Sequence, residues 1–117
     1  MKFSIYHQWL IHESSSVIKM GITPFVKNFL GEFSYFSLPE KTYYLQDETI
    51  FSIESSKTVW DFQAPFNLTL IEHNIEFFNN PNASDPFNHF LFRIETESSL
   101  DTLFDQKGYE QFIGEQL

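Results

Sequence analysis

The sequence contains no cysteine, and this absence removes several kinds of chemistry at once. Without thiols the chain can form no disulfide, no thiolate metal site and no iron–sulfur cluster, and it can have no cysteine nucleophile. Glycine is also scarce, because only four glycines are scattered over the 117 residues. A glycine-rich loop that cradles phosphate groups is therefore excluded as well.

Basic side chains are few: seven Lys and Arg stand against 16 Asp and Glu, for a formal net charge of -9 at pH 7. Nucleic acids and anionic membrane surfaces bind through patches of positive charge, and the chain offers none. Long apolar runs are missing too, and residues 1–6 show neither a signal peptide nor an Arg-rich transit peptide. We therefore expect no nucleic-acid partner, no membrane association and a cytoplasmic location.

Apolar and aromatic side chains, by contrast, are abundant. They make up 42% and 19% of the residues, with 15 phenylalanines among them. This is the composition of a folded protein rather than a disordered one. The length favours a single domain, 1–117, with one hydrophobic core.

Short segments with β-strand character dominate the first three quarters of the chain. The clearest alternation runs through residues 59–64, where Trp60 and Phe62 share one face. Phe33 and Tyr35 are likewise expected on a common face of their strand. The predicted strands are 9–11, 17–20, 32–38, 48–54, 59–64, 68–72 and 90–95, the first two forming a hairpin around the polar residues 13–16.

One short helix is predicted inside this β region. Thr23 suits a helix N-cap, Pro24 suits the first helical position, and Gly31 stands where the helix would end. These signals predict a helix over 24–30. The Asn- and Pro-rich stretch 73–89 is expected to be a loop with one helical turn at its start.

The C-terminal tail, from Ser99 onward, shows helical spacing. Leu100, Leu103 and Phe104 follow the helical spacing i, i+3, i+4, and the same spacing recurs after Gly108. Gly108 is expected to break the tail into two short helices. The predicted fold class is therefore mainly β and mostly antiparallel, with a short internal helix and a helical C-terminal tail.

The sequence gives little support to an enzyme active site or a metal site. The four histidines are His7, His12, His73 and His89, and they form no compact cluster with acidic residues. His7 and His12 are five apart in a strand region, so we expect them on opposite faces. No nucleophile motif is present. We expect no catalytic residue, no metal, a solvated acidic surface, and aromatic side chains that serve as core and cover.

Lys57 is the feature that stands out. It lies at the tip of a predicted tight turn between the strands 48–54 and 59–64, among small polar residues. A lysine in this position is sterically open on a flexible stem, as an acylating enzyme requires. Amide formation would remove its charge and turn the side chain into a tether. The alternative is an ordinary exposed surface lysine.

An ordered set of short motifs covers nearly the whole chain, from Trp9 to Phe112. Together these motifs resemble the H protein of the glycine cleavage system, a lipoyl carrier. The motifs, with the family residues that they resemble or match, are His7-Gln8-Trp9 (His-Glu-Trp), Gly21-Ile22-Thr23 (Gly-Ile-Thr), Leu30-Gly31, Leu38-Pro39-Glu40, Glu54-Ser55-Ser56-Lys57 (Glu-Ser-Val-Lys) and Ser84-Asp85-Pro86-Phe87 (Ser-Asp-Pro-Tyr).

The resemblance implies a barrel-sandwich hybrid fold and lipoate joined to Lys57 by an amide bond, with Glu54, Ser55 and Asp61 around the arm. A lipoate ligase or a lipoyl/octanoyl transferase would attach the group. An H protein is not an enzyme by itself. It receives an aminomethyl group from the P protein, presents it to the T protein and is reoxidised by the L protein.

The chain also departs from the family in ways that matter. Cleft residues that are Ser and Glu in the family are Tyr6 and Gln8 here, so a cationic amine would lose one carboxylate partner. Several family glycines are replaced, one of them by Leu68.

Two alternative functions remain open on the sequence. The string Ser56 to Val59 also resembles H-like proteins found with lipoate-ligase, sirtuin and macrodomain genes. That branch would make the chain a lipoate relay with sirtuin or macrodomain partners in ADP-ribosylation-linked stress control. A further alternative is an unmodified β module that only binds partners.

Overall fold

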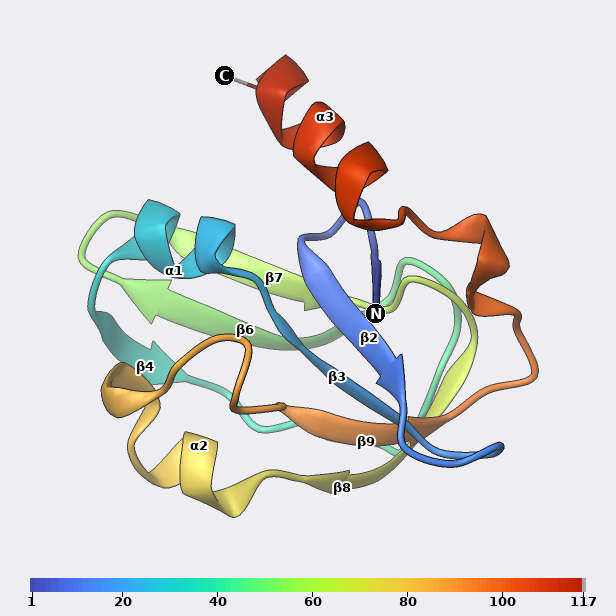
Figure 1. Ribbon diagram of the computed structural model, residues 1–117. Helices are drawn as coiled ribbons and strands as arrows, with labels where there is room; N and C mark the ends of the chain where they lie inside the picture. The colour runs from blue at the N-terminus through green and yellow to red at the C-terminus, as the bar shows by residue number, and fades with distance from the viewer. Residues whose placement is uncertain (117) are drawn as a thin grey trace.

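The computed structural model describes residues 1–116, and residue 117, the last of the predicted domain, lies outside the described residues. Two antiparallel sheets carry the fold (Figure 1). The larger sheet has the strand order β1-β2-β3-β9-β8-β5, and the smaller has the order β4-β6-β7. The larger sheet consists of β1 (Lys2–Phe3), β2 (Gln8–His12), β3 (Ile18–Ile22), β9 (Phe92–Glu95), β8 (Leu68–His73) and β5 (Tyr43–Tyr44), and the smaller of β4 (Phe33–Phe36), β6 (Thr49–Ser55) and β7 (Val59–Gln63).

The two sheets meet through phenylalanine rings. Phe51 of β6 lies 5.2 Å from Phe62 of β7 and 5.4 Å from Phe92 of β9, measured between ring centroids. Phe62 also contacts Phe92 at 5.6 Å. All three rings are buried. Edge-to-face and tilted ring pairs add to the stabilisation from apolar burial, so these contacts hold the β6–β7 hairpin against the larger sheet.

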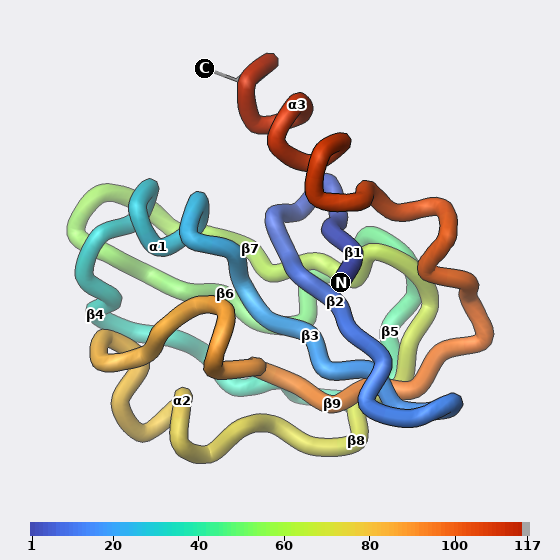
Figure 2. Tube along the Cα trace, in the orientation of Figure 1, coloured from blue at the N-terminus to red at the C-terminus, as the bar shows by residue number. Residues whose placement is uncertain are grey.

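Within residues 1–116, three α-helices and two short 3₁₀ turns connect and cover the sheets. They are α1 (Pro24–Leu30), α2 (Ile75–Asn79), η1 (Pro81–Ala83), η2 (Leu100–Thr102) and α3 (Gln106–Gln116). Figure 2 shows α1 beside the turn that joins β6 to β7, and α3 above β1. None of the helices within residues 1–116 is long and apolar enough to cross a membrane.

Helix α1 has the predicted bounds, but its N-cap works differently from the prediction. Thr23 occupies the N-cap position, yet its side chain makes no capping hydrogen bond. The Thr23 hydroxyl is instead 2.6 Å from the Tyr109 hydroxyl. Pro24 opens the helix, and Gly31 ends it at φ 74°, in the left-handed region that favours glycine.

The C-terminal tail does form two short helices, but the predicted break at Gly108 is wrong. Gly108 lies in the first turn of α3, where its N–H donates to Asp105 Oδ1 at 2.7 Å. Asp105 thus satisfies one of the helix's unpaired amides. The interruption falls before it, where Phe104 leaves helical geometry to form a β-bridge with Phe3.

The alternation predicted for 32–38 is also wrong, because the register shifts by a β-bulge between Phe33 and Tyr35. Phe33 is buried, whereas Tyr35 is 61% exposed. The side-chain amide of Asn82 holds Phe33 in place. Its Oδ1 accepts from the Phe33 N–H at 2.7 Å, and its Nδ2 donates to the Phe33 carbonyl at 2.9 Å. The stretch 73–89 begins with the expected helical turn, α2, which Asn74 caps by accepting from Glu76 N.

A network of charges ties together strands of the larger sheet. Arg93 Nε donates to Glu13 Oε1 at 2.8 Å, and its Nη1 donates to Glu72. Lys19 Nζ lies 3.2 Å from Glu13, and the Arg93 guanidinium sits 4.5 Å from the centre of the Phe90 ring. Hydrogen bonds from Arg93, and then from Lys19, hold the pKa of Glu13 below its usual range.

We expect Gly21→Ala to destabilise the fold, by about 1–3 kcal/mol as is typical of overpacking. A Cβ at Gly21 would lie 2.5 Å from the Trp9 ring, which is buried and cannot move aside. Chemical denaturation measures the loss. Gly114→Ala is the matched control, because a Cβ there meets nothing within 4 Å and Ala favours a helix. Equal stabilities for the two variants would contradict the packing argument.

We expect Arg93→Met to flatten the acid dependence of stability. A carboxylate whose pKa is depressed in the folded state stabilises the protein above its unfolded pKa of about 4.3, and that contribution is lost as the pH falls through the folded pKa. Without Arg93 the pKa of Glu13 rises toward its unfolded value, so less stability is lost between pH 6 and pH 3. Urea titrations at several pH values test this. Lys107→Met should behave as the wild type, because Lys107 makes no ion pair among the described residues.

Candidate functional site

The predicted site lysine lies at the tip of the β6–β7 hairpin. Glu54 and Val59 are the last paired residues, and the Ser55 N–H donates to the Thr58 carbonyl at 3.0 Å to close the turn. Within the turn the Lys57 N–H donates to Ser55 Oγ at 3.2 Å. The hairpin and the exposed position predicted for Lys57 are therefore confirmed.

The Lys57 side chain extends toward α1. Its Nζ lies 3.4 Å from the carbonyl oxygen of Phe29, near the C-terminal end of the helix. The last carbonyls of a helix have no partner within the helix and carry partial negative charge, so a cation is favoured there. The Lys57 amine therefore lies at the C-terminal end of α1.

Four aromatic rings follow α1 away from Lys57, and we call this group the aromatic seam. Phe25 and Phe29 lie on one face of the helix with parallel rings 6.5 Å apart. Trp60 of β7 meets Phe29 edge-on at 5.7 Å and Phe25 at 6.5 Å. His7 completes the seam, stacked on Phe25 at 3.9 Å. The seam thus connects the Lys57 end of α1 with the turn that precedes β2.

A cleft of about 440 Å³ opens beside the seam. The β1–β2 turn forms one side of the cleft, and β7, an edge strand of the smaller sheet, forms the other. Asp61 is the one carboxylate in its lining. The lining residues are Ile5, Tyr6, His7, Phe25, Val59, Trp60, Asp61 and Gln63.

Trp60 carries a buried polar atom that is unused. Within residues 1–116 its indole Nε1 makes no hydrogen bond, although the atom is excluded from solvent. A buried N–H without an acceptor costs stability, and such groups are rare in folded proteins. Because the atom is excluded from solvent, a ligand in the cleft could use this donor only after the Trp60 ring moved.

The two residues that differ from the H-protein pattern, Tyr6 and Gln8, form hydrogen bonds within the protein. The Tyr6 hydroxyl donates to Asp47 Oδ1, and this hydrogen bond is the main cause that raises the pKa of Tyr6. Gln8 is completely buried. Its Oε1 accepts from Ser4 Oγ at 2.8 Å, and its Nε2 donates to the Gln63 carbonyl at 2.7 Å. Gln8 is therefore available to a ligand only if these bonds break, whereas Tyr6 still lines the cleft beside its bond to Asp47.

The other predicted site residues lie at different distances from the turn. Ser55 is part of the turn with Lys57, and Glu54 is exposed at its base. Asp61 lies further along β7, opposite Ser52, from which it accepts a hydrogen bond at 2.8 Å. The structure thus places Glu54 and Ser55 beside the lysine and Asp61 in the cleft.

The histidines differ from the prediction. His7 does not lie in a strand but in the turn before β2, with φ 59° and its side chain buried. Only His12 belongs to β2, at its exposed end, so the expected strand with His7 and His12 on opposite faces is wrong. His73 and His89 lie elsewhere, against Phe78 and Asp85 respectively. Residues 1–116 hold no group of three or more His, Asp and Glu placed to bind a metal.

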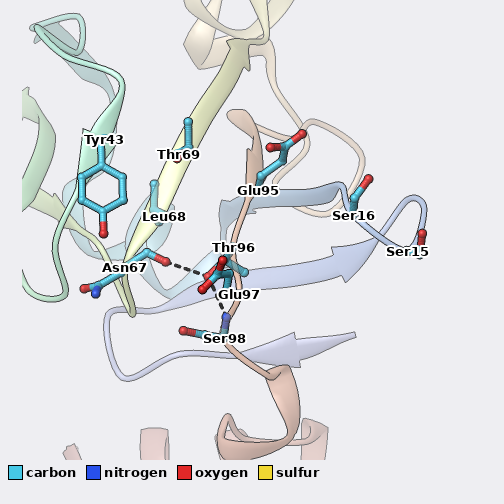
Figure 3. Close-up of a pocket in the computed structure, with 10 residues that line it drawn as sticks. All are labelled: Ser15, Ser16, Tyr43, Asn67, Leu68, Thr69, Glu95, Thr96, Glu97 and Ser98. Atoms are coloured by element: carbon cyan, nitrogen blue, oxygen red, sulfur yellow. Dashed lines mark hydrogen bonds between the residues drawn. The ribbon is translucent and has the colours of Figure 1, made fainter.

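A second hollow, of about 670 Å³, lies away from the predicted site residues (Figure 3). In it the Thr96 hydroxyl donates to the Asn67 carbonyl at 2.6 Å and accepts from the Ser98 N–H at 3.1 Å. Glu95 and Glu97 also line it. Some of its polar groups thus hydrogen-bond to one another. None of them was predicted as a site residue from the sequence.

The seam was not predicted from the sequence, because the aromatic side chains were expected to serve only as core and cover. The spacing of Phe25 and Phe29 was visible as one helix face, and Trp60 follows Lys57 by three residues. Their contact across α1 and β7 is tertiary and has no local signal. The link from His7 to Thr23 and Tyr109 was missed for the same reason.

Comparisons with known proteins agree with one another. Residues 1–116 match the family model described as Glycine cleavage H-protein. The chain is 31% identical over 121 residues to the glycine cleavage system H protein of Pectobacterium atrosepticum, covering 98% of this chain and 93% of the relative. It is 33% identical over 120 residues to that of Staphylococcus epidermidis, covering 97% and 94%.

A solved structure shares the fold. The crystal structure of a glycine cleavage system H protein from Mycobacterium marinum superposes with a TM-score of 0.80 at 22% sequence identity, covering 98% of this chain and 94% of that one. The predicted barrel-sandwich fold is confirmed.

We expect Gln8→Glu to destabilise the protein by about 1–3 kcal/mol, the cost of a buried polar group that loses its partner. A carboxylate would set an oxygen against the Gln63 carbonyl that the Gln8 amide now satisfies. Thermal and urea unfolding at neutral pH measure the effect. Gln46→Glu is the control, because Gln46 is exposed. A Gln8→Glu protein as stable as this control would contradict the assignment of Gln8 as a structural bridge.

Proposed function

The chain belongs to the glycine cleavage H-protein family, whose members are lipoyl carriers, and we propose that its lipoyl group is attached to Lys57. The observation that carries the proposal is the position of this lysine at the tip of a closed hairpin turn, beside the end of α1. A ligase can reach such a side chain without unfolding the protein.

Three of the five other lysines are less suited to attachment. Lys19 and Lys41 form ion pairs with Glu13 and Glu48, and Lys27 donates to the Ser84 carbonyl. None of these three lies at the tip of a tight hairpin. The motif Glu54-Ser55-Ser56-Lys57, which resembles the family's Glu-Ser-Val-Lys, points to the same residue.

Attachment would join the lipoate carboxyl group to Lys57 Nζ as an amide, with loss of water and of the positive charge. When bound, the lipoyl group supplies a thiol for a one-carbon aminomethyl cargo and a disulfide that exchanges two electrons. The chain contains no cysteine, so no thiol of its own can compete with the arm by exchange.

The residues beside Lys57 fit such an arm. Beyond Nζ a lipoyl chain extends roughly 10 Å, given covalent bonds of about 1.5 Å. The seven residues of α1 span a similar length, about 10 Å at 1.5 Å per residue. Phe29, Trp60 and Phe25 would therefore hold its hydrocarbon and sulfur atoms, which pack well on aromatic rings.

The cleft offers a cationic cargo fewer carboxylate partners than the family pattern implies. Asp61 lines it, but the position that the resemblance assigns to a Glu is Gln8, which is bound within the protein. A cationic amine would thus meet one carboxylate instead of two. We expect this chain to protect its cargo from water less well than H proteins with both.

The family implies the P, T and L proteins as partners and makes the chain a carrier subunit rather than a catalyst. A lipoate ligase or a lipoyl/octanoyl transferase would load Lys57. The comparisons give no support to the sirtuin- and macrodomain-linked relay or to an unmodified binding module. The cytoplasmic location stays a prediction.

We expect co-expression with a lipoate ligase to add one lipoyl group, seen by intact mass. Lys57→Arg should abolish the addition, because guanidinium cannot be acylated in its place, whereas Lys107→Arg should be loaded fully. The loaded protein should support glycine–bicarbonate exchange by the P protein. A mass shift that survives Lys57→Arg would overturn the attachment site, and a loaded protein without exchange would overturn the glycine cleavage role.

A further inference from the structure

Tyr109, on α3, reaches two segments that flank the cleft. Its hydroxyl oxygen lies 2.8 Å from Nδ1 of His7 and 2.6 Å from Oγ1 of Thr23. His7 belongs to the cleft lining, and Thr23 is the residue before α1. One phenolic group thus connects the C-terminal helix, the turn before β2 and the start of the seam helix.

The three side chains form a buried polar group within apolar surroundings. Tyr109 and His7 are each 4% exposed and Thr23 is fully buried. Burial raises the pKa of Tyr109, opposed by the hydrogen bond with Thr23, so the phenol keeps its proton at neutral pH. A hydroxyl with one proton between two partners donates to one and accepts from the other. The tautomer of His7 is therefore coupled to the direction of the Tyr109–Thr23 bond.

The backbone of His7 is already fixed. Its φ of 59° lies in the left-handed region, which costs energy for a residue with a side chain. The His7 N–H donates to the Ser4 carbonyl at 3.2 Å, and the His7 carbonyl accepts from Thr23 N at 3.1 Å. The ring stacks on Phe25 at 3.9 Å. What the Tyr109 hydroxyl adds is the orientation of the imidazole within its plane.

The ring of Tyr109 does not need its hydroxyl to hold α3 in place. It stacks on Phe3 with centroids 4.7 Å apart and planes 8° from parallel. Phe112 of the same helix stacks on Phe104 at 5.0 Å. These apolar contacts dock the helix without the hydroxyl, whose two hydrogen bonds go to His7 and Thr23 beside the cleft.

We propose that Tyr109 is a positioning residue of the carrier site, whose hydroxyl, braced by Thr23, holds the His7 ring against Phe25 and so maintains the cleft wall that meets the arm. This inference rests on the proposed function, because it concerns the cleft that receives the arm of Lys57. It makes the C-terminal helix part of the site, although that helix is remote in sequence from the attachment turn.

The variant Tyr109→Phe removes the hydroxyl and keeps the ring stack on Phe3. We expect the imidazole ¹⁵N resonances of His7 to shift in long-range ¹H–¹⁵N spectra, because its Nδ1 partner is lost. The resonances of His12, His73 and His89 should not move, since no contact joins them to Tyr109. Tyr43→Phe is the matched control, because Tyr43 is exposed and lies at the second hollow.

Thr23 supplies a second route to the same test, which is needed if Tyr109→Phe fails to fold. Thr23→Val removes the brace at nearly constant volume and should reproduce the His7 shift, whereas Thr23→Ser keeps the hydroxyl and should retain the wild-type signature. In loaded protein, Tyr109→Phe and Thr23→Val should release aminomethyl cargo to water faster, by up to about fivefold, the largest factor that one lost hydrogen bond in the cleft wall would supply.

Unchanged His7 resonances in both Tyr109→Phe and Thr23→Val would overturn the proposal. So would a shifted His7 with an unchanged release rate, because Tyr109 would then be structural only. The spectra are recorded on protein without the lipoyl group. A failure to load Lys57 would therefore contradict the proposed function while the His7 measurement still stands.

Discussion

Ring packing between the two sheets is the contact on which the rest of the molecule depends. Phe51 and Phe62 of the β6–β7 hairpin meet Phe92 of the larger sheet in the centre of the core. These contacts fix the base of the hairpin, so its closed turn extends outward with Lys57 at the tip. In this chain of 15 phenylalanines and four glycines, the burial of aromatic rings holds the hairpin rigidly. The flexible Lys57 side chain therefore extends from a fixed position.

The same aromatic excess continues outside the core as the seam. Trp60 belongs to the hairpin and Phe25 to α1, so the seam joins the lysine-bearing element to the helix beside it. His7 closes the seam and is held from behind by α3 through Tyr109. A carrier must hold its arm and also release it to several enzymes. Packing against aromatic rings, with few charged contacts, allows the arm to bind and to leave.

Local signals in the sequence predicted local structure well. Pro24 and Gly31 marked the ends of α1, and the alternation around Phe62 marked β7, because both signals act within a few residues. The bulge at Phe33 was not predictable, since it depends on Asn82 far along the chain. The left-handed turn at His7, whose carbonyl accepts from Thr23 N–H, and the two-residue strands β1 and β5 likewise follow from tertiary contacts. The position of Gly108 within α3 has a local cause that was missed, because Asp105, three residues earlier, accepts from its N–H. The attachment lysine was identified from a turn and an ordered motif, whereas the seam around it required the fold.

The central claim is that an arm on Lys57 lies against the seam, and the two tryptophans allow a direct measurement. Trp60 Nε1 has no acceptor among the described residues, whereas Trp9 Nε1 donates to the Pro86 carbonyl at 2.7 Å. Indole ¹H–¹⁵N spectra recorded before and after lipoylation report on both. An arm that lies on the seam should shift the Trp60 resonance and leave the Trp9 resonance unchanged. An unchanged Trp60 resonance in fully lipoylated protein would contradict that claim.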